Sequence, residues 1–169
     1  MIVKVQDIKP LLARGRIEPA AVLPELRKLA ASDQWKTREV AATALVEIGK
    51  RRPAEVLREA RRWAKARDLN VRRAASEGLR GIAKLDPNAV LPVLEMLRAD
   101  PELYVKKSVA NVLRNASARH PEFVLDVCRQ WALSSNPHTR WIIKDGLRKL
   151  NGSQPREVRA ILDSLEGSA

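Results

Sequence analysis

Lysine and arginine side chains recur in this sequence at intervals of 34 residues. Arg73 and Lys107 form one such series, and Arg80, Arg114 and Arg148 form another. Guanidinium and ammonium groups repeated in this way are suited to binding the phosphates of a nucleic-acid backbone, a contact that does not depend on base sequence. The first chemistry that the residues indicate is therefore anion binding along an extended surface.

Three carboxylates lie among these cations, where they would repel phosphate: Glu39, Glu77 and Asp145. One interpretation makes them ion-pair partners that hold neighbouring arginines in place. A second makes them candidate catalytic residues, because a carboxylate can stabilise a cationic nucleobase or the oxocarbenium-like sugar that forms when an alkylated base leaves. Trp141, one helical turn before Asp145, would then lie against a sugar or a positively charged base. Both interpretations remain open from these residues alone.

Five prolines mark an internal repeat that runs through the whole chain. They stand at a constant spacing of 34 residues, at Pro19, Pro53, Pro87, Pro121 and Pro155. After each proline, Val returns at the third following position and a bulky apolar residue at the tenth, and each complete copy has Leu at the twenty-sixth. Such self-similarity predicts a repeat protein that binds its partner along an extended surface.

The composition favours helices over strands, because Ala and Leu are abundant and only 4% of the residues are aromatic. A tetratricopeptide repeat has the same length, but its Trp…Leu-Gly…Tyr pattern is absent. We expect a single all-α domain, an α-α superhelix or solenoid of HEAT-like helical hairpins. The expected units are an N-terminal cap helix in 1–18, four repeats over 19–52, 53–86, 87–120 and 121–154, and a partial capping repeat in 155–169.

The second repeat shows how each unit divides into two helices. Proline suits the first turn of a helix, and the apolar spacing after Pro53 predicts a first helix from Pro53 to Ala66. A polar break follows, in which Asp68 or Asn70 can cap a second helix from about Val71 to Leu85. At the two ends of the chain we expect helices over Gln6 to Ala13 and Pro155 to Leu165.

The face of each second helix opposite its Ala, Val, Leu and Ile positions is expected to line a concave surface. A further cation stands in the first turn of each second helix, where the helix dipole disfavours positive charge unless a phosphate docks there. The alternative is that these cations are solvated and that their stems cover neighbouring repeats. The nucleic-acid-binding candidates are Arg38, Arg72, Arg73, Arg80, Lys106, Lys107, Arg114, Arg140, Trp141, Lys144 and Arg148.

The overall charge points to the same class of partner. The chain carries 32 Lys and Arg against 20 Asp and Glu, a formal net charge of +12, which favours a polyanion. An anionic membrane surface or a generally basic proteome would also account for it. Because there is no apolar run near ~18 residues and no signal-peptide core, we expect a cytoplasmic protein that associates with the nucleoid when bound to DNA.

Other residues that often carry chemistry are expected to be structural. Trp63 and Trp131 occupy a site where other copies have Leu, and the lone Cys128 sits in a helical apolar pattern, so all three are predicted core residues. His120 and His138 have no Cys, His or carboxylate at ligand spacing, which predicts no metal site. No Gly-rich phosphate loop and no Ser/His/Asp arrangement is present, and we expect no cofactor.

Two stretches of sequence carry a family resemblance. They read NVRRAASEGLR at 70–80 and YVKKSVANVLR at 104–114. Together with Trp141-Ile142-Ile143-Lys144 and His120-Pro121, they resemble the HEAT-like DNA alkylation-repair proteins, closest to the AlkC branch and more distantly AlkD. The resemblance covers about residues 30–150. It implies a kinship with alkylpurine DNA glycosylases, which excise cationic N3- or N7-alkylated bases without a metal or a cofactor.

The resemblance also implies roles for single residues. Arg73 is similar to the phosphate-gripping arginine of the family, and Glu77 and, more loosely, Glu39 are similar to its active-site acids. Asn115 and Leu85 stand where the AlkC pattern has Asp and Trp, and Asn111 stands where the AlkD pattern has an aromatic residue. The resemblance therefore supports DNA binding more strongly than base excision.

Three functional hypotheses follow from the sequence. The first is a monomeric DNA-binding solenoid of the alkylation-repair type, which grips double-stranded, alkylated or distorted DNA by its phosphates. The second is an active glycosylase in which Glu77 stabilises the departing cationic base. The third is a scaffold whose groove holds an acidic protein partner, a common use of repeat proteins.

Overall fold

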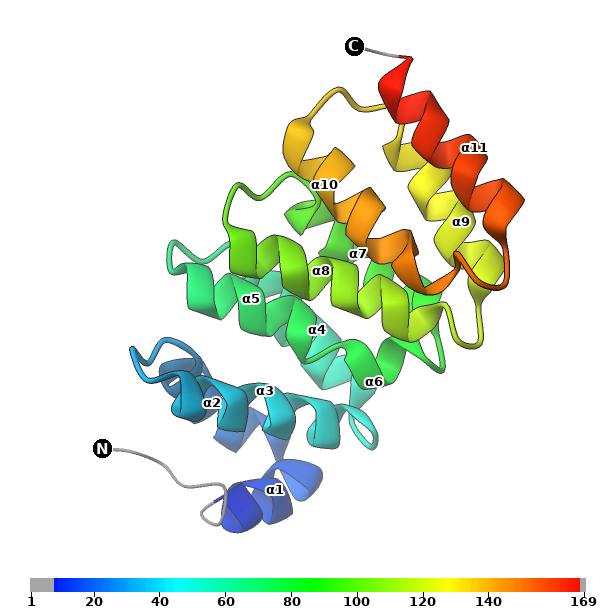
Figure 1. Cartoon of the computed structure of the whole chain (residues 1–169). Coiled ribbons are helices and arrows are strands. Elements are labelled where there is room, and N and C mark those ends of the chain that lie inside the picture. Colours follow the sequence, from blue (N-terminus) through cyan, green and yellow to red (C-terminus); the bar gives the residue numbers. More distant parts are fainter. Residues whose placement is uncertain (1–7, 168–169) are drawn as a thin grey trace.

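The computed structural model describes residues 8–167. Helices make up all of the regular structure in that range, which confirms the predicted all-α class (Figure 1). In chain order they are α1 (Ile8–Ile17), α2 (Pro19–Ala30), α3 (Trp35–Gly49), α4 (Pro53–Trp63), α5 (Leu69–Glu77), α6 (Arg80–Ala83), α7 (Pro87–Leu97), α8 (Leu103–Ala116), α9 (Pro121–Trp131), α10 (Pro137–Gly146), the short 3-10 turn η2 (Leu147–Lys149) and α11 (Pro155–Glu166).

The repeated prolines set where the first helix of each hairpin begins. Helices α2, α4, α7, α9 and α11 start at Pro19, Pro53, Pro87, Pro121 and Pro155. Proline is favoured there because the first helical N–H has no partner inside the helix and the ring already fixes a helical φ. The predicted first-helix starts are therefore confirmed at all five prolines.

The hairpins stack into a solenoid in which the second helices form one layer. Figure 1 shows α3, α5, α8 and α10 following one another across the molecule, with α4 and α7 behind them. Helix α5 packs on both α3 and α8, and α8 packs on α10. Each hairpin thus covers its apolar sides with the hairpins before and after it, as repeat proteins do.

The core consists of the apolar positions that recur with the repeat. No side chain in this set is more than 3% exposed: Val22, Val56, Val90, Val124, Val158, Leu45, Leu79, Leu113 and Leu147. Trp63 and Trp131 are also buried, and their indole N–H groups donate to Glu59 at 3.1 Å and Glu95 at 2.6 Å. Cys128 is buried too. The predicted core roles of the two tryptophans and the cysteine are confirmed.

The second helix of the second repeat differs from its prediction. A continuous helix from Val71 to Leu85 was expected, but α5 ends at Glu77 and α6 begins at Arg80. Between them the Leu79 N–H donates to the Ser76 carbonyl at 2.9 Å, three residues back instead of four. The turn is tighter there, so the regular α-helical ladder is interrupted.

Close packing between neighbouring second helices explains the interruption. A Cβ at Gly78 would lie 2.7 Å from the Leu45 Cβ on α3, so only glycine allows this approach. Gly146 holds the equivalent position two repeats later, facing Leu113, and α10 likewise gives way to η2 immediately after it. Glycine has a low helix propensity, so the residue that permits the contact also weakens the helix.

The other helix boundaries shift by smaller amounts. Helix α4 ends at Trp63 and not at Ala66, because the N–H of Ala66 turns back to the Trp63 carbonyl at 3.0 Å. The expected helix over Gln6 to Ala13 is α1, which starts within the described range at Ile8 and continues to Ile17; Gln6 lies outside the described residues. The C-terminal helix reaches Glu166. The division of the chain into cap, repeats and partial repeat stays a prediction.

Candidate nucleic-acid interface

An open groove of about 460 Å³ crosses α3, α5 and α8. These helices lie next to one another in Figure 1, so the groove joins side chains from three consecutive repeats. It is lined by Trp35, Arg38, Glu39, Asn70, Arg73, Glu77, Tyr104, Lys107, Ser108, Asn111 and Arg114. We call this surface the central groove.

The spacing of the repeat explains why these side chains meet. Glu39, Arg73 and Lys107 hold the same place in successive copies, and so do Glu77 and Asn111. Because the copies stack in register, equivalent residues form rows across the helices, and the two rows are one helical turn apart. Rows of this kind are what the sequence pattern predicts.

The predicted site residues divide into two sets. The central groove brings together six of them, Arg38, Glu39, Arg73, Glu77, Lys107 and Arg114. The residues that do not line it are Arg72, Arg80, Lys106, Arg140, Trp141, Lys144, Asp145 and Arg148.

Glu39 makes an ion pair with Arg73 across the interface between α3 and α5. The Arg73 side chain is 20% exposed and the Glu39 side chain 41%, so the pair lies at the groove surface. An exposed pair of this kind adds little stability, typically about 0–1 kcal/mol. Its main effect is on geometry, because it fixes where the Arg73 guanidinium points.

Glu77 is the most shielded of the three candidate acids, with 7% of its surface exposed. Its carboxylate lies 3.0 Å from Arg80 Nη1, and Arg80 Nε also donates to the Glu77 backbone carbonyl at 3.2 Å. The ion pair offsets the cost of burying the charge. Glu77 is therefore a shielded, ion-paired carboxylate among the residues that line the central groove.

Asp145 lies outside the central groove, near the C-terminal ends of α8 and α10. It pairs with Arg114 and, at 3.1 Å, with Arg148. The Arg114 guanidinium also donates to the Asp145 backbone carbonyl at 3.2 Å. Asp145 thus holds two arginines on a neighbouring surface, which Asn115 helps to line.

The first-turn cations mostly face their own loops. Arg38 donates to the carbonyls of Ser32 and Asp33 at 2.8 and 2.9 Å, and Arg140 donates to the Ser134 carbonyl at 3.3 Å. These acceptors are carbonyl oxygens of the loop between the two helices of a hairpin, so the contacts stabilise a positive charge that the start of the second helix disfavours. Lys106 lies 3.3 Å from His138 Nδ1 and stands over the Trp141 ring at 5.5 Å.

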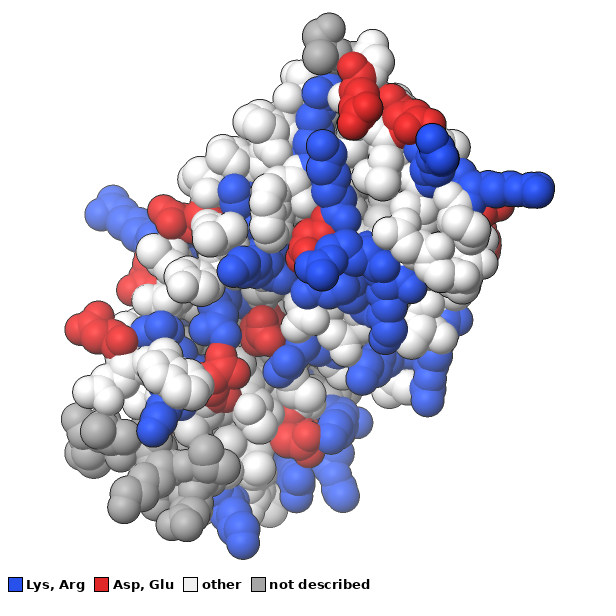
Figure 2. All heavy atoms as spheres, viewed as in Figure 1, with Lys and Arg blue, Asp and Glu red and all other residues white. Residues whose placement is uncertain are grey.

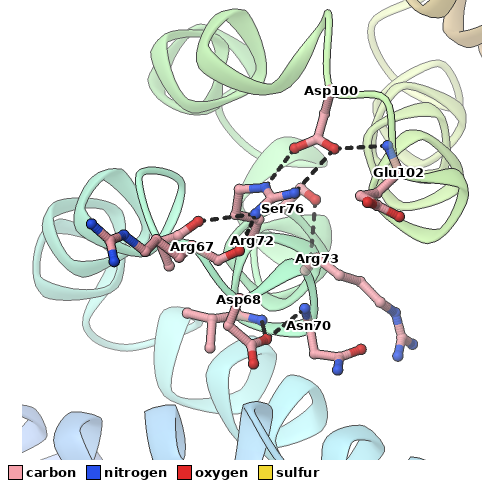
Figure 3. A network of polar contacts seen from close by, with 10 residues as sticks. Arg67, Asp68, Asn70, Arg72, Arg73, Ser76, Asp100 and Glu102 are labelled. Atoms are coloured by element: carbon pink, nitrogen blue, oxygen red, sulfur yellow. Dashed lines mark hydrogen bonds and ion pairs between the residues drawn. The ribbon is translucent and has the colours of Figure 1, made fainter.

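Arg72 shows this arrangement most fully (Figure 3). It donates to the loop carbonyls of Ala66 and Arg67 at 3.0 and 2.8 Å and to the Asp100 carboxylate at 2.6 Å. The hydrogen bond to Asp100 raises the pKa of Arg72 above its ordinary value, although burial acts in the opposite direction. The Arg73 side chain points away from this network in Figure 3, so the two neighbouring arginines serve different surfaces.

Two buried serines support Arg73 from below. Ser76 and Ser108 place their hydroxyl oxygens 2.6 Å apart, and each hydroxyl also lies 3.1 Å from the Arg73 carbonyl oxygen. Ser108 belongs to α8, so this contact ties α8 to α5 beneath the groove. The arrangement fixes the backbone that carries Arg73.

The aromatic side chains exposed in the central groove do not include Trp141, the aromatic candidate from the sequence. Trp141 is partly buried against the core. Trp35 and Tyr104 are 63% and 61% exposed, and both line the central groove. Trp35 lies between the two helices expected in the first repeat, where the sequence indicates neither a core nor a surface role, and Tyr104 is not among the candidate binding residues. A sequence signal for both existed, because Trp35 and Tyr104 each stand in the first turn of a second helix, next to candidate phosphate-binding cations.

Figure 2 shows how charge is distributed on the face of the molecule that carries these helices. Lys and Arg side chains gather over the C-terminal ends of α8 and α10, and acidic side chains lie between cations elsewhere on that face. The cations at those helix ends include Arg114, Arg148 and Lys149. Positive charge thus continues beyond the central groove.

Residues 8–167 contain neither a membrane-spanning helix nor a cluster of metal ligands. No helix in that part of the chain is long and apolar enough to cross a membrane. Within the same residues, no three His, Cys, Asp or Glu side chains come together in a way that could hold a metal ion. His120 instead lies 3.1 Å from the Lys84 carbonyl oxygen through its Nε2.

Comparison with known proteins identifies the family. The sequence model of the DNA alkylation repair enzymes matches residues 12–150. The chain belongs to this family. The match covers most of residues 19–154, where four repeats are predicted, and confirms the resemblance carried by the 70–80 and 104–114 stretches. Among proteins with a curated description, none matches the sequence.

Three solved structures show the same fold. The alkylpurine DNA glycosylase AlkC of Pseudomonas fluorescens, bound to DNA containing an abasic site analog, is 28% identical with a TM-score of 0.75 over 90% of this chain. AlkD2 of Streptococcus mutans is 26% identical with a TM-score of 0.70 over 85%, and smu.31 of Streptococcus mutans UA159 is 29% identical with a TM-score of 0.66 over 78%. This family member spans 43% of the AlkC chain, 72% of the AlkD2 chain and 69% of the smu.31 chain.

Proposed function

We propose that this member of the DNA alkylation repair family binds duplex DNA by gripping its phosphates in the central groove. The observation that carries the proposal is the convergence of Arg73 and Lys107, from consecutive repeats, on one open groove with Arg38 and Arg114 at its edges. Guanidinium and ammonium groups are the usual partners of DNA phosphates. The abasic-site DNA bound by AlkC, a structure with the same fold, supports the proposal.

The acids in the groove are compatible with phosphate binding. Four cations line the groove against two carboxylates, so positive charge prevails there. Glu39 is paired with Arg73 and Glu77 with Arg80, so neither carboxylate faces the groove as an isolated charge. A carboxylate that holds an arginine in one orientation reduces the entropy that the arginine loses when it binds a phosphate.

A fluorescence-anisotropy titration with a labelled duplex tests this proposal. We expect Arg73→Ala and Lys107→Ala each to weaken binding about tenfold, because each removes a charge-assisted contact to a phosphate. The loss should be the same on unrelated sequences, since phosphate contacts carry no base information. Arg58→Ala is the matched control, because Arg58 is an exposed cation on α4 outside the groove.

Two results would contradict it. If Arg73→Ala and Lys107→Ala bind as the wild type does while Arg58→Ala is weakened, the DNA surface lies elsewhere. If an acidic polypeptide displaces the duplex and binds more tightly than other polyanions, the groove serves as a scaffold for an acidic protein partner.

Excision of N3- or N7-alkylated purines is a second candidate function, and one observation favours it. The Glu77 carboxylate is largely shielded from solvent and lines a groove that is also lined by four cations. A carboxylate in such a site can stabilise the positive charge that develops on a sugar as a cationic base departs. No metal or cofactor takes part in this proposal.

Release of free bases from methylated DNA tests the second candidate. The wild type should release 3-methyladenine or 7-methylguanine, and Glu77→Gln should bind the same DNA without releasing them. Asn115, which replaces an acid of the family pattern, donates to the Asn111 carbonyl at 2.8 Å and supplies no carboxylate. If neither protein releases a base although both bind DNA, the groove is a binding surface only.

A further inference from the structure

Two aromatic side chains at the rim of the central groove are exposed without an apparent structural reason. Trp35 and Tyr104 leave about three-fifths of their surfaces open to solvent, whereas Trp63 and Trp131 are buried. A single exposed apolar residue is common, but two aromatic rings that line one groove mark it as a candidate binding site. Both rings belong to the same groove as the phosphate-binding candidates.

The rings occupy related places on different helices. Trp35 is the first residue of α3, and Tyr104 is the second residue of α8, while Asn70 on the intervening helix α5 also lines the groove. They therefore stand at the same end of the layer of second helices, on either side of α5. A ligand that follows the groove across the repeats would meet both.

Each ring is accompanied by a cation. The Lys36 ammonium lies 5.9 Å from the centre of the Trp35 ring, and the Lys107 ammonium lies 5.6 Å from the centre of the Tyr104 ring. An aromatic face next to a cation matches a nucleotide, whose base can stack while its phosphate is neutralised. Proteins that bind unpaired nucleic-acid bases use this combination.

Trp141 shows that the combination is not simply repeated along the solenoid. Its ring also lies under a cation, Lys106, but it packs against the core and Lys106 also contacts His138. It offers less free surface than Trp35 or Tyr104. Stacking capacity is thus concentrated at the central groove.

We propose that Trp35 and Tyr104 stack on unpaired bases, so that the groove prefers DNA containing an unpaired base to a fully paired duplex. The inference rests on the proposed function and names the DNA structure that the groove selects. In a paired duplex both faces of each base are covered by its neighbours, so the rings have nothing to stack on. A bulged base has a free face, and the groove cations hold the backbone on either side of it.

The test compares two labelled duplexes of the same flanking sequence, one fully paired and one with a single bulged base. Stacking on an aromatic ring is worth about 1–3 kcal/mol per base, so the wild type should bind the bulged duplex about tenfold more tightly or better. The variant Trp35→Ala/Tyr104→Ala should lose this preference, and Trp35→Phe/Tyr104→Phe should keep it. Arg73→Ala should weaken binding of both duplexes equally. Leu133→Ala, at an exposed apolar residue outside the groove, is the control for surface truncation.

Fluorescence gives a readout that does not depend on affinity. Trp63 and Trp131 are buried and Trp141 is partly buried, so the difference in emission between the wild type and Trp35→Phe isolates the exposed Trp35 indole. That emission should be quenched by the bulged duplex and not by the paired one. Failure to bind either duplex would overturn the proposed function itself. Binding of both with equal affinity, or a preference that survives Trp35→Ala/Tyr104→Ala, would overturn only the stacking role.

Discussion

Arg72 and Arg73 are neighbours in the sequence but belong to different parts of the molecule. Arg72 joins the loop after α4 to Asp100, which precedes α8, whereas Arg73 faces the central groove and pairs with Glu39. Adjacent residues on a helix point about 100° apart, so consecutive cations can reach different surfaces. Arg72 is thus placed to stabilise the fold, and Arg73 is the one that we propose binds DNA phosphate.

Substitution of these two arginines should separate stability from binding. The Arg72 and Asp100 side chains are 17% and 7% exposed, so Arg72→Ala leaves a largely buried carboxylate without its partner. We expect it to lower the free energy of unfolding by about 3–5 kcal/mol. Arg73→Ala breaks a more exposed pair and should cost about 0–1 kcal/mol. Urea denaturation followed by circular dichroism measures both, and equal losses would show that the arginines have the same role.

The thiol of Cys128 should be unreactive in the folded protein. Burial raises the pKa of Cys128 to about 12, so almost no thiolate is present at pH 8. A thiol reagent at that pH should therefore modify Cys128 only as α9 opens or the protein unfolds. Labelling should become rapid in denaturing urea. Rapid labelling of the native protein would show that α9 opens readily.

For single residues, the sequence predicts which side chains share a surface better than it predicts which groups each side chain contacts. The 34-residue period places Arg73 and Lys107 on one surface without any structure. It does not show that Arg72 turns to Asp100, because that contact depends on the path of the following hairpin, 28 residues along the chain. Nor does it separate Tyr104, which is exposed in the groove, from Trp141, which rests on the core.

Helix starts and helix ends in this protein are set by different forces. Starts are local, because proline and capping residues such as Asp68, which accepts from the Asn70 and Val71 N–H groups at 2.8 and 3.0 Å, act within one turn. Ends depend on tertiary contacts, such as the approach of Gly78 to Leu45. The helix starts could therefore be predicted from sequence, and the division of the second helix into α5 and α6 could not.

The two glycines of this segment should respond in opposite ways to alanine. In Gly78→Ala the new methyl group would lie 2.7 Å from the Leu45 Cβ, which is attached to backbone and cannot move aside cheaply. We expect a loss of about 1–3 kcal/mol in stability. Gly81→Ala meets Val46 at an ordinary 3.4 Å and should be neutral or stabilising by up to about 1 kcal/mol. Thermal unfolding of both variants measures the difference, and an unaffected Gly78→Ala would mean that α3 and α5 are less closely packed.

The whole molecule is a stack in which each hairpin contacts its neighbours, so equivalent residues of successive repeats form continuous rows. A stack of this kind provides an extended surface rather than a deep pocket. The central groove is open and crosses three helices, as expected for such a surface. The repeat period, the all-α fold and the family could be predicted from the sequence, because the same residue pattern recurs in every copy of the repeat. The proposed preference for one DNA structure rests on single side chains, which the repeat does not determine.

We expect the protein to be monomeric in solution. Its repeated apolar positions are covered within the stack, and a net charge of +12 makes self-association unfavourable at low ionic strength. Light scattering coupled to size-exclusion chromatography should give a mass near 18.9 kDa. A mass twice that value would show a dimer, and the exposed Leu133 beside the surface between α9 and α11 would be the first place to seek its interface.

The dependence of DNA affinity on salt concentration tests phosphate binding by the central groove most directly. Each phosphate neutralised by the protein contributes about 0.9 to the slope of log affinity against log salt concentration. The wild type should therefore bind more weakly as the salt concentration rises. The double substitution Arg73→Ala/Lys107→Ala should reduce the slope by about 1.8. Arg58→Ala, outside the groove, should reduce the slope by less. An affinity that does not change with salt, or a slope that the double substitution leaves unaltered, would contradict the account.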